Sequence, residues 1–211
     1  MYEYHKINSI FKRDENGKII PWDFSIPEFE YLQENIWEFT EKIDGTNIRI
    51  IWQNGQITFA GKTNRAQIPL FLLDKLHKIF DDKTNIFNEL FQDKNVCLYG
   101  EGYGNRIQSV GKLYIPNDVN FILFDVLING IWLLRKDIDE IAIKLNIKSV
   151  PSIGEGNFKK AVAITANGFN SNIGNLKAEG MVLRPKVELK DRFGNRIITK
   201  IKTKDFIGIS Y

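Results

Sequence analysis

The sequence contains few of the residues that build metal centres or disulfide frameworks. Its 211 residues include one cysteine, Cys97, and two histidines. A single cysteine cannot form an internal disulfide. Because Cys97 stands between strand-forming residues, we interpret it as a small core residue rather than a reactive thiol. Zinc binding is equally unsupported by this composition.

Long apolar runs and a strong net charge are also missing. No run approaches the roughly 20 residues that a membrane-spanning helix needs, so we expect no membrane partner. The amino terminus lacks the basic region and apolar stretch of a secretory signal, which makes the cytoplasm the expected location. The net charge is +3, from 29 Lys and Arg against 26 Asp and Glu. Such a charge does not prove nucleic-acid binding, although it would not repel a polyanion.

Two common phosphate-binding patterns are absent as well. A dinucleotide-binding G-x-G-x-x-G pattern beginning in the stretch 100–104 would need glycine where Asn105 or Ile107 stands. A Walker loop is not found either. What remains is Glu101, framed by glycines that let a ligand approach the backbone, and Glu179, which is also followed by glycine. A charged strand end at the surface is the alternative interpretation of each glutamate.

The pattern of apolar residues predicts an α+β fold over residues 1–211, as a single domain with antiparallel sheets and inserted helices. Asp137 is expected to cap one helix, with Glu140 completing a capping box. The first forty residues suggest an irregular lead-in and 168–177 an exposed loop. The expected strands are 48–52 and 56–60, joined as a hairpin by Asn54-Gly55, with 96–99, 120–127, 180–183 and 196–201; the expected helices are 69–80, 137–145 and 158–166.

Lys42 is the candidate nucleophile. It stands two positions before Asp44-Gly45, and a lysine beside a carboxylate can attack covalently once nearby cations favour its neutral amine. In a strand, Lys200 and Lys202 would project from one face, and a nucleoside triphosphate between them would relieve their repulsion. The alternatives are a surface turn at Lys42 and a solvated strand edge at the two lysines.

Five segments in order resemble motifs I, III, IIIa, IV and V of the covalent nucleotidyltransferases, which are the polynucleotide ligases and RNA capping enzymes. Asn47 extends the first of them to Lys-x-x-Gly-x-Asn, which is most similar to the RNA ligase family typified by the phage double-strand RNA ligase. The resemblance implies a nucleotidyltransferase, ATP-grasp-like ligase domain whose sheets and helices flank a nucleotide pocket. The segments are Lys42-Ile43-Asp44-Gly45, Tyr99-Gly100-Glu101-Gly102-Tyr103-Gly104, Phe121-Ile122-Leu123-Phe124-Asp125-Val126, Glu179-Gly180-Met181-Val182 and Lys200-Ile201-Lys202.

The resemblance also implies a role for each matching residue. Lys42 would attack the α-phosphate of ATP, release pyrophosphate and hold AMP, while Lys200 and Lys202 would act on the phosphates. A Mg²⁺ ion, or Mn²⁺, would be held mostly through water by Asp44, Glu101 and Glu179. Phe124 would stack on adenine and Glu101 would contact the ribose. The full set of implied nucleotide-binding residues is Glu41, Lys42, Asn47, Lys62, Glu101, Phe124, Glu179, Arg184, Lys200 and Lys202.

The sequence departs from the family pattern in two places. Lys62 stands where these ligases usually carry an arginine, and Arg49 and Arg65 are alternatives for that role. After motif V the chain ends at Tyr211, so we expect no appended OB-fold or carboxy-terminal helical domain. RNA binding would then depend on a protein partner or on a basic surface of this chain. The alternative interpretation of these basic residues is that they only form a solvated face. The residues available for such a surface are Lys6, Lys12, Arg13, Arg106 and Lys112.

The expected activity is that of an ATP-dependent RNA ligase in RNA repair. It would join 3′-OH and 5′-phosphate RNA ends, nicked duplexes included, through a lysyl-AMP intermediate and an adenylylated RNA end. A small ATP-dependent DNA ligase or a capping-type guanylyltransferase is the alternative among enzymes. A nucleotide-binding or nucleic-acid-binding protein without turnover is the alternative outside enzymes. The sequence does not indicate the oligomeric state.

Overall fold

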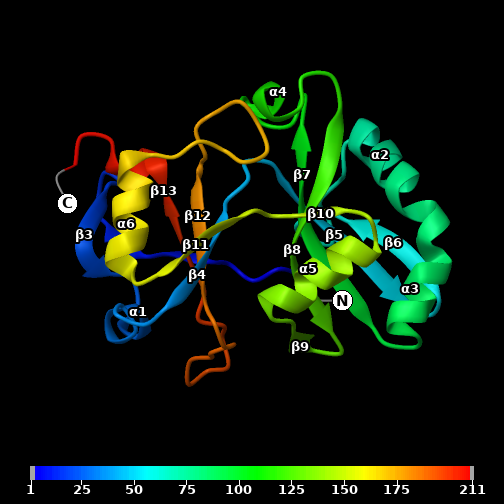
Figure 1. Cartoon of the computed structure of the whole chain (residues 1–211), viewed down its shortest axis with the longest axis horizontal. Helices are drawn as coiled ribbons and strands as arrows, with labels where there is room; N and C mark the ends of the chain where they lie inside the picture. Colours follow the sequence, from blue (N-terminus) through cyan, green and yellow to red (C-terminus); the bar gives the residue numbers. More distant parts are fainter. Residues whose placement is uncertain (1–2, 210–211) are drawn as a thin grey trace. The chain divides into compact units, whose positions relative to one another are not determined.

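A computed structural model describes residues 3–209 of the chain (Figure 1). These residues divide into two compact units. Unit 1 comprises the described residues up to His5 together with Asp44–Val150, and unit 2 comprises Lys6–Ile43 and the residues from Pro151 onward. Expectations placed on residues 1, 2, 210 and 211, at the two termini, lie outside the described residues. No helix within 3–209 is long and apolar enough to cross a membrane.

Unit 1 is built on a mixed sheet with the strand order β10-β8-β7-β5-β6, in which β9 also pairs with β8. All pairings are antiparallel except that of β10 with β8. Asn54 and Gly55 join β5 to β6 with φ angles of 52° and 73°, so the expected hairpin is confirmed. The strands are β5 (Thr46–Gln53), β6 (Gln56–Ala60), β7 (Val96–Gly104), β8 (Val119–Ile128), β9 (Ile131–Trp132) and β10 (Lys148–Ser149).

Strand β7 continues through the glycine-rich stretch, well beyond the expected end at Tyr99. A Cβ atom on Gly100 would lie 2.2 Å from the Phe121 ring, and one on Gly102 would lie 2.6 Å from Leu72. The glycines therefore let β8 and helix α2 (Leu70–Phe80) pack directly against β7. The stretch is a packing device of the sheet as well as a candidate ligand-binding segment.

Helices α2, α3 and α5 of unit 1 contribute to one apolar core with strands β5, β7 and β8. The expected stripe on α2 is confirmed, with Leu72, Leu76 and Phe80 buried. The predicted cap at Asp137 is wrong. Helix α5 begins two residues earlier, because Arg135 bonds Asp139 one turn ahead and the carbonyl of Val150. The Glu140 capping box fails with it. The helical segments are α2 (Leu70–Phe80), η1 (Asp81–Lys83), α3 (Thr84–Phe91), α4 (Gly111–Tyr114) and α5 (Arg135–Lys144).

Unit 2 contains a five-stranded sheet with the order β1-β13-β12-β4-β11, in which only β1 and β13 are parallel. Helix α6 contributes Phe158, Ala161 and Val162 to the core of this unit. Its amino terminus is capped by Asn157, whose side chain accepts from Lys160 N. The strands are β1 (Asn8–Ser9), β4 (Trp37–Glu41), β11 (Ser152–Gly156), β12 (Gly180–Pro185) and β13 (Thr199–Lys202), and helix α6 spans Phe158–Asn167.

The expectation of an irregular lead-in is wrong. The first forty residues form β1, β4, a β2–β3 hairpin and helix α1, and they bury Phe11, Phe29 and Trp37 in the core of unit 2. The strands are short, Pro21 lies within one of them, and Pro27 begins a helix of only five residues, so the periodic pattern was too brief to predict these elements. The elements not yet bounded are β2 (Phe11–Arg13), β3 (Ile19–Phe24), α1 (Pro27–Tyr31) and η2 (Thr203–Phe206).

Candidate active site

Three adjacent strands of unit 2 bring the motif lysines together (Figure 1). Lys42 directly follows β4, Glu179 directly precedes β12, and Lys202 ends β13. The register pairs Gly180 with Lys202, and the N–H of Lys42 donates to the carbonyl of Gly180 at 2.9 Å. Lys42 and Lys202 therefore lie on either side of β12, although 160 residues separate them in sequence.

Glu179 is bonded to both lysines. Its Oε2 lies 2.5 Å from Lys42 Nζ, and its Oε1 lies 2.6 Å from Lys202 Nζ. The three side chains are only 15–23% exposed. Burial alone would raise the pKa of the Glu179 carboxyl, but the nearby charge of Lys42 and the hydrogen bonds from Lys202 and Lys42 hold that pKa below its ordinary value.

This cluster has a net charge of +1, because one carboxylate faces two ammonium groups. The neighbouring strands add further cations. In an antiparallel pair, residues directly opposite each other project from the same face, and Lys200 lies opposite Val182. Arg184 is two residues beyond Val182 and therefore shares the face of Lys200 and Lys202, while Ile201 is buried on the other face. The predicted projection of the two motif lysines is confirmed, and the face is suited to an anion.

Glu41 lies on the opposite face of this sheet. It pairs with Met181, which is buried in the core of unit 2, and its own side chain is 1% exposed. Its carboxylate accepts from Ser171 Oγ at 2.5 Å and from the N–H of Asn172 at 2.9 Å. The direct nucleotide contact expected of Glu41 stays a prediction. Its position makes it the anchor of the 168–177 loop, which precedes Glu179.

Motifs I and III meet within unit 1. A Cβ atom on Gly45 would lie 2.3 Å from the carbonyl oxygen of Gly102, so glycine is required where the two segments pack. The N–H of Asp44 donates to Tyr114 Oη at 3.2 Å, and Gln108 Nε2 donates to the carbonyl of Gly45 at 2.9 Å. These contacts fix the turn that follows the candidate nucleophile.

Asn47 and Glu101 are cross-strand partners on β5 and β7, so their side chains share one face of the unit 1 sheet. Ile48 and Ile50 alternate with Asn47 and point into the helix-covered core. Asn47 Oδ1 is buried and has no hydrogen-bond partner among residues 3–209. A buried polar atom of this kind calls for an explanation, and a ligand that donates a hydrogen bond provides one.

Phe124 occupies a β-bulge. Asp125 pairs with Tyr99 and Leu123 pairs with Gly100, so Phe124 is the extra residue between them. Such bulges redirect side chains beside functional sites. The edge of the Phe124 ring packs against Tyr4, with ring centroids 5.1 Å apart and planes at 74°, and the Tyr4 hydroxyl donates to Asp125 at 2.8 Å. Phe124 packs against the small apolar cluster that contains Tyr99, and Tyr99 lies two residues before Glu101 on the same face of β7.

The three candidates for the arginine role have different environments. Arg49 is fully buried, and its guanidinium donates to the carbonyl of Gly61 at 2.8 Å and to Asn64 Oδ1 at 2.9 Å. It therefore supports the loop that carries the other two candidates. Lys62 and Arg65 are both exposed on that loop, and the choice between them stays a prediction.

The predicted metal ligands are divided between the units. Asp44 and Glu101 belong to unit 1, and Glu179 belongs to unit 2. Their carboxylates are the hard oxygen donors that Mg²⁺ and Mn²⁺ prefer. Across residues 3–209, however, no group of three or more His, Cys, Asp or Glu side chains is gathered closely enough to hold a metal. The chemistry of the donors fits a divalent cation, but the described chain offers no preformed cage.

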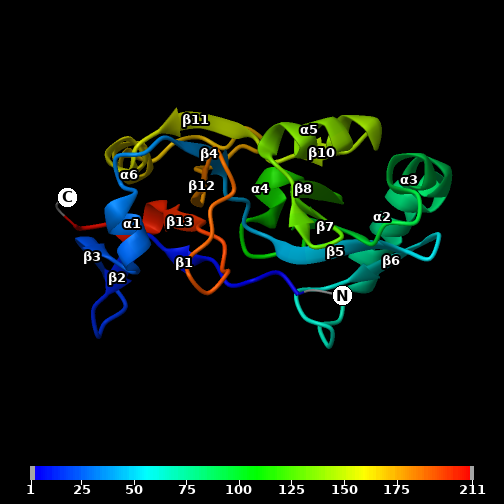
Figure 2. The same cartoon turned by 90° about the horizontal axis from the view of Figure 1, so that it is seen from below.

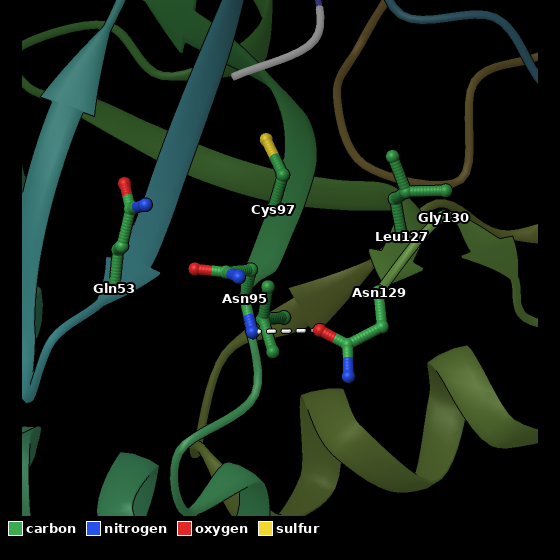
Figure 3. Close-up of a pocket in the computed structure, with 7 residues that line it drawn as sticks. Gln53, Asn95, Cys97, Leu127, Asn129 and Gly130 are labelled. Atoms are coloured by element: carbon green, nitrogen blue, oxygen red, sulfur yellow. Dashed lines mark hydrogen bonds between the residues drawn. The ribbon is translucent and has the colours of Figure 1, made fainter.

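A separate pocket of about 540 Å³ opens in unit 1, beside the carboxyl end of β5 and the amino end of β7 (Figure 3). None of the predicted site residues lines it. Burial raises the pKa of the Cys97 thiol to about 11, which supports its interpretation as an unreactive core residue. The lining residues are Gln53, Asn95, Val96, Cys97, Leu127, Asn129 and Gly130.

Several supporting residues escaped the sequence-based predictions. Ser171 and Asn172 bind Glu41, Tyr114 binds the backbone of Asp44, and Tyr4 contacts Phe124. The Asn-, Gly- and Ser-rich composition of 168–177 signalled a loop but not its anchoring. These contacts join residues that lie about 70–130 positions apart, so no local sequence pattern predicts them.

Comparison with known proteins bears on the family and on the fold. The family model described as RNA ligase matches residues 35–202. A variant of the Naegleria gruberi RNA ligase solved with ATP and Mn superposes with a TM-score of 0.66 at 19% identity, covering 96% of this chain and 62% of that chain. The same enzyme solved with PPi gives a TM-score of 0.65 at 19% identity, covering 97% and 63%. A third structure, a variant of the same enzyme with AMP and Mn, gives a TM-score of 0.64 at 18% identity, covering 95% and 62%.

At these identities the superpositions establish a shared fold. The chain spans about 62% of the length of the solved chains that it matches. A comparison with curated protein sequences gave no match. The family model extends over far more than half of the chain and includes both motif lysine segments. The chain belongs to the RNA ligase family.

Proposed function

We propose that the protein is an ATP-dependent RNA ligase. It joins RNA 3′-OH and 5′-phosphate ends through an AMP held covalently on Lys42 and an adenylylated RNA end. The observation that carries this proposal is the cluster of Lys42, Glu179 and Lys202 on three adjacent strands. Family membership supports it, as do the related structures of the Naegleria gruberi RNA ligase with ATP, AMP and Mn.

In the first step, the neutral amine of Lys42 attacks the α-phosphorus of ATP. An N–P bond forms, the bond from the α-phosphorus to the bridging oxygen breaks, and pyrophosphate leaves. Glu179 holds the Lys42 ammonium before the reaction, so Lys42 must leave this ion pair and pass its proton to solvent before it attacks. Because the pKa of Glu179 is held low, its carboxylate positions the amine rather than taking up the proton at neutral pH.

The cations on the same sheet face balance the phosphate charge that builds up during the displacement. Lys200, Lys202 and Arg184 share that face and would contact the phosphates of ATP. A phosphate that pairs with Lys202 also competes with Glu179 for that ammonium group. The same positive charges would therefore bind the phosphates of ATP and stabilise the departing pyrophosphate.

The face of the unit 1 sheet opposite its helix-covered core is the proposed nucleoside-binding surface. It carries Phe124 for stacking on adenine, Glu101 for the ribose, and Asn47, whose buried oxygen has no partner among residues 3–209. This assignment, with an ATP-grasp-like nucleotide pocket, follows the family pattern and is part of the proposal. The cytoplasmic location is also part of it.

A divalent cation, Mg²⁺ or Mn²⁺, would accompany ATP. Asp44, Glu101 and Glu179 are the residues proposed to hold it, mostly through water. That mode suits an ion that gives up its hydration shell reluctantly, and it needs no preformed carboxylate cage. When bound, the cation supplies charge neutralisation on the phosphates.

Mass spectrometry after incubation with Mg²⁺ and ATP tests the covalent step. We expect the intact protein to gain the mass of one AMP with ATP, no adduct with GTP, and none in Lys42→Ala. Lys12→Ala is a matched control, because Lys12 is also ion-paired, at 2.7 Å with Asp23, and should leave the adduct intact. The absence of an adduct with either nucleotide would refute the enzymatic proposal and leave a binding protein without turnover.

Strand-joining assays on three substrates determine which class of polynucleotide the protein joins. Nicked RNA duplex, single-stranded RNA ends and nicked DNA are compared under identical conditions. Sealing of RNA supports the proposal. Sealing of nicked DNA alone would make the protein a small DNA ligase, and a GMP adduct would make it a capping-type guanylyltransferase.

A further inference from the structure

The segment between β12 and β13, residues 186–198, leaves the unit 2 sheet as an extended loop (Figures 1 and 2). We call it the 186–198 loop. Its stem is held by the carbonyl of Leu189, which accepts from Ile197 N at 2.9 Å. Arg196 is buried in the stem and donates to both oxygens of Glu188, at 2.5 and 2.9 Å. The loop is therefore a built structure rather than a loose connection.

Asp191 orders the tip of this loop. One of its carboxylate oxygens accepts the N–H groups of Phe193 and Asn195, both at 2.8 Å, and the other accepts from Asn195 Nδ2 at 2.8 Å. Gly194 closes the turn with a φ angle of 82°, and its N–H donates to the carbonyl of Asp191. The backbone of Arg192 and Phe193 is thus fixed before any partner arrives.

The tip presents an aromatic ring beside a cation. The Phe193 side chain is 74% exposed, and the guanidinium carbon of Arg192 lies 4.6 Å from its ring centroid. Lys190, two residues before Arg192, is exposed as well. Other charges of the loop are neutralised, since Lys186 pairs with Glu155 and Arg196 pairs with Glu188. The positive charge that remains for a partner lies next to the exposed ring.

We propose that the tip of the 186–198 loop binds unpaired RNA, with Phe193 stacking on a base and Arg192 and Lys190 contacting the adjacent phosphates. Single-stranded nucleic acids are bound through this combination, because every base has a π face and every linkage carries negative charge. With Arg192 over one side of the ring, the other side is accessible to a base. This proposal rests on the proposed RNA ligase function and names a contact to its polynucleotide.

Two of the five basic residues expected from the sequence to bind RNA are already engaged in ion pairs. Lys12 pairs with Asp23 at 2.7 Å, and Arg13 pairs with Asp205 at 2.8 Å. A phosphate would have to displace these carboxylates. Within the described range 3–209, Lys190 and Arg192 form no ion pair, and the oxygens of the adjacent turn-forming Asp191 are already bonded to the backbone and to Asn195.

Fluorescence anisotropy of a short labelled single-stranded RNA, titrated with the full chain in the absence of ATP, tests the proposal. Base stacking contributes about 1–3 kcal/mol, so Phe193→Ala should raise Kd by roughly 5- to 150-fold, whereas Phe193→Trp should bind as well as the wild type. Arg192→Ala should weaken binding and lower the salt dependence by the equivalent of about one phosphate contact. Tyr31→Ala is the matched control, because Tyr31 is an 87% exposed aromatic elsewhere in unit 2, and it should not change Kd.

Equal binding by Phe193→Ala and Tyr31→Ala would overturn the proposal, as would failure of the wild type to bind the RNA. Binding that depends on Phe193 only for fully paired duplex would overturn the assignment to unpaired RNA. The AMP adduct is measured separately on the same preparations. A missing adduct with Phe193-dependent binding would refute the proposed enzymatic function and leave the loop assignment standing.

Discussion

Glu179→Gln is the substitution that most directly tests the arrangement around Lys42. In the wild type, the carboxylate is bonded to two ammonium groups at 2.5 and 2.6 Å, in a setting where all three side chains are largely buried. Glutamine has nearly the same shape but no charge and only one acceptor oxygen. The substitution therefore removes the attraction without leaving a cavity, and Lys42 and Lys202 face each other without a counter-charge.

The expected loss of stability follows from the two bonds. A hydrogen bond to a charged group contributes about 1.5–3 kcal/mol and a neutral one about 0.5–1.5 kcal/mol. Glutamine loses one bond and weakens the other, so we expect a decrease of about 2–4 kcal/mol in the free energy of unfolding. For a chain of this length each kcal/mol lowers Tm by about 2–4 °C, which gives a decrease of roughly 5–15 °C.

The effect should depend on pH in a defined direction. The pKa of Glu179 in the folded protein lies below its ordinary value of 4.5, so the carboxylate stabilises the fold fully above that value. The contribution is lost as the pH falls through the lowered pKa, where the wild-type side chain becomes neutral like glutamine. The difference between wild type and Glu179→Gln should thus be largest near pH 7 and shrink steadily below about pH 4.5.

Urea unfolding of wild type and variant at several pH values between 3 and 7 provides the measurement. Glu155→Gln is the control, because Glu155 forms an exposed ion pair with Lys186 at 2.6 Å, and its loss should leave the midpoint unchanged. A difference between wild type and Glu179→Gln that is absent at pH 7, or that is the same at every pH, would refute the inferred ion-pair cluster. The variant should also fail to form the AMP adduct.

Two further substitutions test the framework of the site. Glu41→Gln removes the charge that binds Ser171 and the following backbone amide, so the free energy of unfolding should fall by about 1.5–3 kcal/mol. Hydrogen exchange should speed up in the 168–177 loop, and unchanged exchange there would contradict its anchoring by Glu41. Gly180→Ala places a Cβ 2.0 Å from the carbonyl of Ile201 and should cost about 2–4 kcal/mol, measured by urea unfolding. Gly154→Ala has open space around its Cβ at a φ angle of 130°, so it should cost less, and equal costs would argue against the close strand contact.

Local patterns predicted the elements whose signals are contained within a few residues. Asn54-Gly55 has the backbone freedom that a tight hairpin needs, and the i, i+3, i+4 spacing on α2 places its apolar stripe, so both were confirmed. The start of α5 was wrong because Arg135 is fixed by Val150, which lies 15 residues later. Capping residues and such tertiary contacts both influence where a helix begins, and the sequence alone does not show which of the two sets its first residue.

The functional prediction depended on the order of the motifs along the chain, which can be recognised without knowledge of the fold. Five short segments in one order indicated Lys42, Glu179 and Lys202 as a set, and the structure unites these three within unit 2. The role assigned to Glu41 was less predictable. Adjacent residues in a strand project to opposite faces, so Glu41, next to the proposed nucleophile in sequence, faces the core rather than the lysine cluster.

The sequence by itself determined which residues are the candidates for the nucleophile, the carboxylates and the phosphate-binding lysines, because each proposed chemical role requires a particular residue type. Tertiary structure alone decided how these groups are paired. The strand register sets Lys42 and Lys202 on either side of Glu179, and the sheet turns Glu41 away towards Ser171. Charges 20 to 160 positions apart interact only after the strands align, and the attraction between them depends on the distance and burial that this alignment creates.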